Sequence, residues 1–502
     1  MTAGTYKISA TMLFILIHCL VWWVTMIAAK APLDGYGDML EVYAWSQHWL
    51  AGSDKHPQFL PWMAKLWFMV APKSVASFYL LSAVNLAVAL LGIAALGRAL
   101  KLDERQVAVA IALSVLALPY LTLSSKLNMN AICLSTWPWA AWAFVRASES
   151  ENRRRTLHAA LLGVLAAITM LSKYYAVVLL LPLFASLLMP SRRWLWRTAM
   201  PWIAGLAFFL VLSPHIYWLL NHRQALAYAS EQGAGGGLGE TALYIGKFAI
   251  APLLYWPIPL LISILLLVEG GIGARLARLA RLPKDGNLLP FLVIGPWLTA
   301  LLFSVAGLAV LSTPWAIPIG FAYTLYLVRN ADTAALAKNG PRIIRAFRIV
   351  WPLLILGGVA IGMMQGVKGD LRHYKPEAEA ARAAIETWQK GHDRPLRWAA
   401  SGINAASLAF FAPAPIEALP ALPDRLPAFY PPRSEWKTEA GVIVCSLAPA
   451  GKTDQACLDE TAAWAEQNGL AAEQATIIVR RSGLRFPDPV DFELAVVYVS
   501  PE

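Results

Sequence analysis

The sequence predicts a polytopic α-helical membrane protein of about eleven spans, with interfacial helices in its first exterior loop and a small α/β domain at its C-terminal end. Of the 502 residues, 58% are hydrophobic and 15% are charged, whereas a soluble chain has about 45–50% apolar and about 25% charged residues. Apolar runs of membrane-spanning length recur until about residue 369, and short strand and helix patterns alternate after it. The expected domains are therefore residues 1–369 and 370–502.

A span requires roughly 20 consecutive apolar residues, within a range of about 17–25. The first apolar run has only Lys7 before it and is too long for the core of a cleaved signal, so we expect a retained anchor. The eleven predicted spans cover residues 8–29, 76–98, 107–123, 132–147, 157–172, 174–190, 198–219, 245–268, 289–309, 311–328 and 348–366.

Basic residues collect in alternate loops, and such loops face the cytoplasm. With the N-terminus in the cytoplasm, clusters at 98–105, 146–155, 192–197, 275–284 and 338–348 all lie inside. This distribution accounts for the net charge of +11 without a nucleic-acid partner. We expect a multi-pass protein of a bacterial inner (plasma) membrane, whose C-terminal domain and active site face the periplasm.

The C-terminal domain should alternate strands and helices. Cys445 and Cys457 are its two cysteines, and they are expected to pair in an oxidising periplasm, although two reduced thiols are the alternative. Helices are expected at 376–390 and 458–467, and strands at 396–400, 441–446, 475–480 and 492–499.

The first exterior loop, residues 30–75, contains the stretch GDMLEVYAWSQHWLAGSDKHPQF at 37–59, with many ionisable groups beside the bilayer. As a helix, residues 38–50 would place Asp38, Glu41, Trp45 and His48 on one face and apolar residues such as Met39 on the other. We expect this helix in the outer interface, with its apolar face in the bilayer, and a second interfacial helix at 60–70. A solvated loop that simply carries charges is the alternative.

Isolated cations also stand in the other exterior loops, in SSKLNMN at 124–130 and in SKYY at 172–175. Cations at the outer ends of spans oppose the topological bias, so they require another reason. An anionic headgroup at the outer interface would supply one. The glycine-rich stretch 233–239 is expected to be a mobile exterior loop over an acceptor, or only a flexible linker.

Several pieces occur in a defined order over residues 30–325: GDMLEVYAWSQHW, the KHP turn, SSKLNMNA, LSKYYAVVLLLP and LSTPWAIPI. In this order the chain resembles the polyprenyl-phosphate-dependent integral-membrane glycosyltransferases with the C-type fold, the group of the protein mannosyltransferases and the lipid A aminoarabinose transferase. The resemblance implies transfer of a sugar from a lipid carrier such as undecaprenyl phosphate, usually with inversion. This chain departs from the pattern at Asp38-Met39, where the family often has Asp-Glu, and at Gln58, where a second proline is common.

The resemblance assigns the catalytic carboxylate to Asp38, with Asp34 as the runner-up and Glu41 in support. Such a carboxylate accepts the proton of an acceptor hydroxyl or positions the acceptor. A capping role at the start of the helix is the structural alternative for Asp38.

A cation is needed where the lipid phosphate departs, because negative charge develops there. We assign this role to Lys55, with Lys126 and Lys173 as secondary candidates. Lys55 as a membrane-surface anchor without a ligand is the alternative.

His56, Tyr174 and His215 are candidate substrate-binding residues. The structural alternatives are that His56 only forms a turn and that His215 is an interfacial histidine whose hydrogen bonds are made within the protein. Asp54, His56 and His215 lack reliable metal-ligand spacing, so neither a metal nor a cofactor is expected.

The expected function is transfer of a sugar from a polyprenyl-phosphate donor to an acceptor at the outer face of the membrane. The acceptor is lipid A or another part of lipopolysaccharide, a different glycolipid of the cell envelope, or a protein. A glycan polymerase or ligase that uses a lipid-linked donor is the first alternative. A transporter for a lipid-linked glycan is the second. Clean span interiors, charge gathered at the outer interface and the lack of two similar halves disfavour it.

Overall fold

The computed structural model describes residues 9–30, 33–149, 151–223, 225, 238–282, 288–367, 375–481 and 490–501. The chain divides into two compact units. Unit 1 contains Met1–Trp23, Ala51–Phe59 and Ser82–Leu353, and unit 2 contains Val24–Leu50, Leu60–Leu81 and Leu354–Glu502. Residues 233–237 of the glycine-rich stretch, and the expected domain boundary at 369, lie outside the described ranges.

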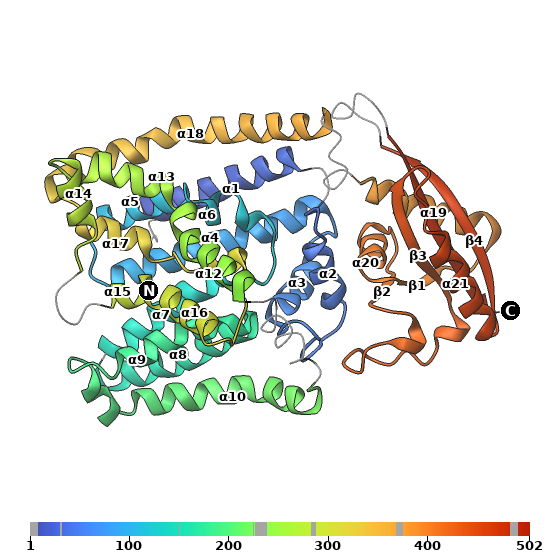
Figure 1. The fold of residues 1–502 in the computed structure, drawn as a ribbon, viewed down its shortest axis with the longest axis horizontal. Coiled ribbons are helices and arrows are strands. Elements are labelled where there is room, and N and C mark those ends of the chain that lie inside the picture. The colour runs from blue at the N-terminus through green and yellow to red at the C-terminus, as the bar shows by residue number, and fades with distance from the viewer. Residues whose placement is uncertain are drawn as a thin grey trace, which may run out of the picture. The chain divides into compact units, whose positions relative to one another are not determined.

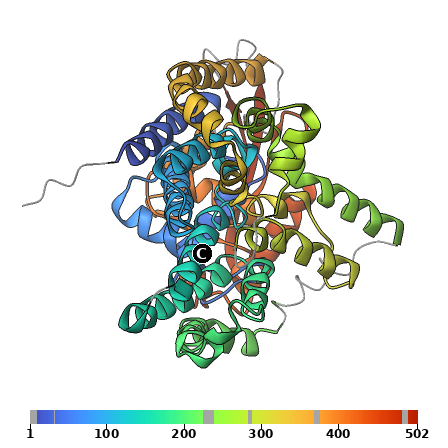
Figure 2. The same ribbon diagram turned by 90° about the vertical axis from the view of Figure 1, so that its left-hand side faces the viewer.

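Helices form nearly all of unit 1, and α8 packs against both α7 and α10 (Figures 1 and 2). The helices α1, α4 and α18 contribute residues to both units. Their bounds are α1 Ala10–Ala29, α4 Val75–Ala99, α5 Glu104–Ser114, α6 Leu118–Leu121, α7 Cys133–Glu149, α8 Asn152–Ser172, α9 Val177–Ser186, α10 Met200–Asn221, α12 Leu238–Tyr255, α13 Pro257–Ile262, α14 Ile272–Leu279, α15 Leu289–Val293, α16 Gly295–Val305, α17 Tyr323–Asn330 and α18 Thr333–Val367.

Among the described residues, five helices are long and apolar enough to cross a membrane, namely α1, α4, α8, α10 and α18, and two bent helix pairs raise the number to seven. On α10, Trp202, Phe209 and Tyr217 are more than half exposed. Such apolar surface is favourable in lipid and costly in water. These helices confirm a multi-pass membrane protein, while the number of eleven spans stays a prediction.

Two of the expected spans correspond to bent pairs of helices. The helix α5 bends by 74° into the segment that begins with α6, and α12 bends by 53° into the segment that begins with α13. Proline stands in the first turn after each break, at Pro119 and Pro257, where its missing N–H costs least. Each bent pair is one broken span or a re-entrant loop, so interrupted helices, a feature of many transporters, are present in this chain.

Unit 2 contains a five-stranded sheet in the order β2-β1-β3-β5-β4. Its first three strands are parallel neighbours, and β5 pairs antiparallel with both β3 and β4. The four expected strands are confirmed, whereas β2 and α20 were not predicted. The elements are α2 Asp38–Ser46, α3 Phe59–Val70, α19 Glu377–Gly391, β1 Leu396–Ala400, α20 Gly402–Phe411, β2 Glu417–Leu419, β3 Ala440–Pro449, α21 Gln455–Gln467, β4 Leu470–Arg480 and β5 Asp491–Pro501.

Side chains alternate between the two faces of a strand, so each face of this sheet has its own cover. On one face Val497 belongs to the same buried cluster as Trp464 of α21. On the other, Tyr498 donates a hydrogen bond to the Ala384 carbonyl of α19 at 2.7 Å. The expected disulfide between Cys445 and Cys457 is present and ties β3 to α21.

The helix α2 is shorter than expected and has different surroundings. It ends at Ser46 rather than at residue 50, and it packs against α20. Met39 and Val42, expected in the bilayer, are 0% and 2% exposed, and Trp45, expected on the polar face, is also buried. The expectation that its apolar face enters the bilayer is therefore wrong, because residues more than 350 positions away cover that face.

Candidate functional site

In unit 1, the segment that carries Lys55 and His56 is held by a turn built on Ser53. The Ser53 hydroxyl accepts hydrogen bonds from the backbone N–H groups of Lys55 at 3.4 Å and His56 at 3.1 Å, and donates one to the His56 carbonyl at 3.0 Å. A short polar side chain that binds backbone two and three residues ahead fixes a tight turn. The turn therefore gives Lys55 and His56 a defined backbone position.

His215 and Tyr174 support the same segment. His215, on α10, lies with Nδ1 2.7 Å from the Ala51 carbonyl and with Nε2 2.9 Å from the Tyr174 hydroxyl. A carbonyl only accepts, so Nδ1 carries the proton and Nε2 accepts from Tyr174. Tyr174 and His215, both expected to bind substrate, thus make these hydrogen bonds to protein groups. The bonds anchor the segment that begins at Ala51.

Lys173 is a buried cation at the junction between α8 and the 3₁₀ turn Tyr174–Ala176. It is 7% exposed, and its Nζ donates to Asn130 Oδ1 at 2.6 Å. The ammonium also stands 4.5 Å from the centre of the Trp315 ring and 5.5 Å from that of Tyr175. Aromatic faces and an amide oxygen stabilise an ammonium that has lost most of its water.

Lys55 and Lys173 both act on His56. Burial first, and then the charges of Lys173 and Lys55, lower the pKa of His56 to about 3. The imidazole is therefore neutral at physiological pH, and two ammonium groups lie within its electrostatic range. We name Lys55, His56 and Lys173 the lysine cluster, because the structure places both lysines near enough for their charges to affect His56.

Lys126 follows the 3₁₀ turn Leu123–Ser125 and is half-buried. In the loop after it, Asn128 Oδ1 accepts from the backbone N–H groups of Asn130 and Ala131 at 3.0 and 3.1 Å. This turn orients Asn130 toward Lys173. The quoted motif SSKLNMNA therefore supplies the partner of the buried ammonium.

In unit 2, Asp34 caps the start of α2. Its two carboxylate oxygens accept from the backbone N–H groups of Tyr36, Asp38 and Met39 at 3.1, 3.2 and 2.8 Å. Gly37 precedes the helix with a positive φ of 80°, a conformation that costs glycine little. Sequence reasoning considered a capping role for Asp38, but Asp34 performs it.

Asp38 and Glu41 both lie in the first turn of α2, three residues apart and half-buried. Side chains at this spacing share one face of a helix. Negative charge is also favourable at a helix N-terminus. The catalytic role expected for Asp38 stays a prediction.

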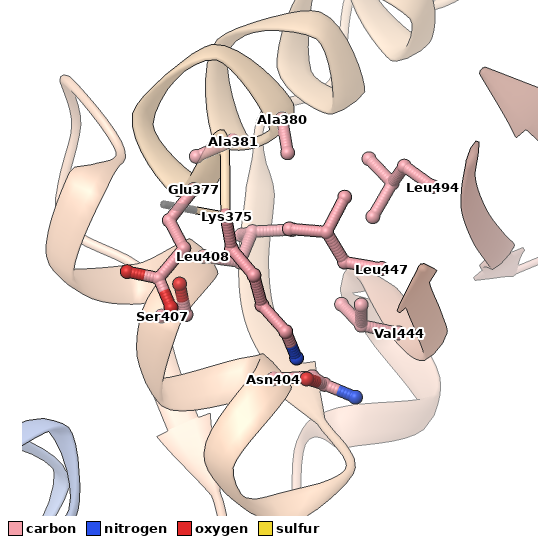
Figure 3. A pocket seen from close by; sticks show the side chains of 10 residues that line it. All are labelled: Lys375, Glu377, Ala380, Ala381, Asn404, Ser407, Leu408, Val444, Leu447 and Leu494. Carbon is pink, nitrogen blue, oxygen red and sulfur yellow. The ribbon is translucent and has the colours of Figure 1, made fainter. Parts of the chain in front are cut away.

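Glu377, at the start of α19, was not expected. Burial raises the pKa of Glu377 to about 7, against the opposing charges of Lys375 and Arg481 and with support from Asp34 and Glu379. The carboxyl group lines a cavity of about 20 Å³, which is room for roughly one water. Figure 3 shows the Glu377 carboxyl beside Ser407, and the Lys375 ammonium beside Asn404, in the wall of this cavity.

In the described part of the chain, no group of three or more His, Cys, Asp or Glu side chains is arranged to hold a metal ion. The site residues described above supply carboxylates, ammonium groups and imidazoles. Carboxylates accept protons, and buried ammonium groups bind anions.

Residues 55–218 match the family model described as dolichyl-phosphate-mannose-protein mannosyltransferase. A search of curated proteins returns no match. Among solved structures, ArnT from Cupriavidus metallidurans in the apo state gives a TM-score of 0.58 at 13% identity, covering 97% of each chain. The same protein bound to undecaprenyl phosphate gives 0.56 at 14% identity, covering 97% of this chain and 98% of ArnT. The chain therefore has the membrane glycosyltransferase fold of ArnT, and its residues 55–218 match a glycosyltransferase family.

The matched segment of this chain contains Lys55, His56, Lys126, Lys173 and other expected residues of unit 1. The expected carboxylates Asp34, Asp38 and Glu41 precede it. Sequence reasoning missed Asn130 as the Lys173 partner, although it quoted the motif that contains this residue. It also missed Glu377, because no pattern around position 377 signals the burial that changes its acidity.

Proposed function

We propose that this transferase moves a sugar from a polyprenyl-phosphate-linked donor to an acceptor hydroxyl or amine at the outer face of a bacterial inner membrane, with inversion. The observation that carries the proposal is the lysine cluster, in which Lys173 is a 7% exposed ammonium held by Asn130 and Trp315, and its charge and that of Lys55 both reach the neutral His56. The ArnT of similar fold binds undecaprenyl phosphate. That lipid has a phosphate head that such cations would bind.

The ammonium groups would act on the leaving group. As the bond between the sugar C1 and the phosphate oxygen breaks, its electron pair stays on the lipid phosphate, whose charge becomes more negative. Lys173 and Lys55 stabilise this charge, and Asn130 and Trp315 hold the Lys173 ammonium in place. His56 is neutral, so it adds a hydrogen-bonding group to the cluster and no charge.

For the nucleophile, we propose Asp38 as the proton acceptor, with Glu41 in support. The acceptor group attacks C1, a new bond to the sugar forms, and its proton passes to the carboxylate. Because all three backbone contacts of the cap are made by Asp34, the proposal ranks Asp38 above it. The acceptor is lipid A or another part of lipopolysaccharide, a different glycolipid, or a protein.

The test compares the surface and lipid-linked glycans of cells that carry the gene, lack it, or carry a variant in its place. Lys173→Met and Asp38→Asn should each lower the transferred product by about 100-fold, because they remove a charge that acts in the transition state. Mass spectrometry of extracted glycans and glycolipids measures the product and identifies the acceptor class.

Lys452→Met removes an exposed lysine of unit 2 and serves as the control, with full product expected. Unchanged glycans in cells without the gene would refute the transferase proposal for these cells. Product that grows by many identical units, rather than by one sugar, would instead identify a polymerase.

A further inference from the structure

The C-terminal end of α2 is joined to the edge of the sheet within unit 2. Gln47, the residue after α2, donates from Nε2 to the Ile416 carbonyl at 2.9 Å and accepts at Oε1 from the Ala418 N–H at 2.8 Å. Because β2 is an edge strand, these backbone groups face outward from the ladder. The Gln47 amide therefore occupies the place of a neighbouring strand.

Glu417, between those two backbone contacts, joins three further side chains. Its Oε1 lies 2.7 Å from His48 Nε2 and 3.3 Å from the Tyr430 hydroxyl, and its second oxygen pairs with Arg433. Arg433 also pairs with Glu439. Glu417 and Arg433 are 19% and 17% exposed, so water screens their attraction less than at a surface pair.

His48 is a neutral donor in this network. Burial, followed by the charges of Lys65 and Arg433, lowers the pKa of His48 below its ordinary value. The Glu417 oxygen is an acceptor, so the neutral ring carries its proton on Nε2. The contact is thus a hydrogen bond from the imidazole to the Glu417 carboxylate, which also pairs with Arg433.

Two exterior lysines act on the helix ends of the same region. Lys65 Nζ donates to the Gln47 carbonyl at 2.7 Å, at the C-terminus of α2. Lys73 Nζ donates to the Ala409 and Ala412 carbonyls at 2.8 and 2.9 Å, at the C-terminus of α20. Cations are favourable at helix C-termini, so these two need no anionic ligand to explain their position.

Aromatic packing holds the middle of α2. The Tyr43 ring lies 5.0 Å from that of Phe410 on α20 and 5.7 Å from that of Phe68 on α3, both edge to face. Together with the cap by Asp34, the helix is fixed at its start, its middle and its end. Elements after residue 400 supply the contacts at the middle and the end.

We propose that Gln47, His48, Glu417 and Arg433 form a positioning clamp that holds α2 and its carboxylates for the transfer reaction. The C-terminal sheet is then a working part of the transferase, not an appended domain. The clamp residues touch no reacting group and act through α2. This inference rests on the proposed function, because it takes Asp38 on α2 as the proton acceptor.

The test uses Glu417→Ala and Glu417→Gln in the full-length protein. The alanine variant removes every contact of the carboxylate, whereas glutamine can still accept from His48 and Tyr430 but loses the charge opposite Arg433. Asp491→Asn is the matched control, since it breaks an exposed arginine–carboxylate pair with Arg480 in the same sheet.

Three measurements are compared. In Glu417→Ala, amide hydrogen exchange of residues 38–47 should accelerate by about tenfold, with an intermediate effect in Glu417→Gln and none in the control. The product measured in cells should fall by about tenfold in Glu417→Ala and be partly restored by glutamine. Binding of undecaprenyl phosphate to the purified protein should stay within about twofold in all three variants, because the phosphate role belongs to other residues.

Exchange of residues 38–47 that matches the control would overturn the clamp, and so would full product from Glu417→Ala. A fall in undecaprenyl phosphate binding equal to the fall in product would assign Glu417 to general folding and also overturn it. Hydrogen exchange requires no substrate, so it reports on the clamp even if Asp38→Asn proves fully active. That last result would refute the proposed role of Asp38 separately.

Discussion

Gly52 decides whether the segment with Lys55 and His56 can pass against α10. A Cβ atom at this position would stand 2.3 Å from the Trp218 ring, closer than any real contact. The indole cannot yield easily, because it stacks between the rings of His215 and His222. The absence of a Cβ atom at position 52 therefore lets the segment with Lys55 and His56 approach α10 this closely.

Gly52→Ala should destabilise the protein by about 1–3 kcal/mol, since overpacking forces side chains or backbone to shift. It should also weaken binding of undecaprenyl phosphate, because the displaced segment carries Lys55. Apparent Tm in detergent and a lipid-binding assay measure the two effects. Gly205→Ala is the control on α10, where an added Cβ meets nothing within 4 Å; equal behaviour of the two variants would contradict the prediction.

Glu377 should make stability depend on pH. Its pKa is about 7 in the fold against an ordinary 4.5, so the folded state holds the proton more tightly than the unfolded state. Stability therefore falls as pH rises from 4.5 through 7, by up to about 3 kcal/mol for this group.

Glu377→Gln stays neutral, so its apparent Tm should exceed that of the unaltered protein at pH 8 and equal it at pH 5. Thermal unfolding at the two pH values measures the difference. Glu379→Gln, in the same helical turn, should retain the original pH dependence. An equal gain from both variants would refute a specific role for Glu377.

At the scale of elements, the N-terminus of α2 is capped by one side chain that lies outside the helix. Helix N-termini leave N–H groups without helical partners, and Asp34 accepts from two residues of the first turn as well as from Tyr36. The sequence placed a helix here correctly within a few residues. It did not predict that Asp34 makes the cap, and it considered capping only as an alternative role for Asp38.

Asp34→Ala should lower the stability of α2 by about 0.5–2 kcal/mol, the usual loss when an N-cap is removed. Amide hydrogen exchange at residues 36–41 should accelerate, while exchange in α5 should not. The matched control is Asp103→Ala, which removes the capping box of α5 and should have the reverse pattern. If exchange in α2 is unchanged in Asp34→Ala, the capping assignment is incorrect.

At the scale of the whole molecule, the disulfide and the distribution of basic residues lead to the same orientation. Both predict the C-terminal part on the oxidising side, and eleven spans would place it there. A phosphatase that folds only in the periplasm, fused after residue 502, should be active. If the fusion after residue 502 is inactive and a fusion at residue 150 is active, the orientation is the reverse of the proposed one.

The disulfide closes a loop over a separation of 12 residues, for which chain entropy gives about 3 kcal/mol of stability. The double variant Cys445→Ser, Cys457→Ser should lower the apparent Tm of the sheet-containing unit. Cys19→Ser, which changes a reduced and buried cysteine, controls for loss of a thiol. A reducing agent should lower the apparent Tm of the unaltered protein to that of the double variant. The same agent should not change the Tm of the double variant itself.

Length and periodicity of apolar runs are local properties, so the sequence by itself determined the membrane class, most helices and four of the five strands. It also identified Lys55, His56 and Lys173 as separate candidates. Only the tertiary structure decided that these three meet, that Asp34 caps α2, and that Glu417 contacts a histidine 369 positions earlier. The physical reason is that burial, acidity and hydrogen-bond partners depend on groups brought together by folding, which no local pattern records.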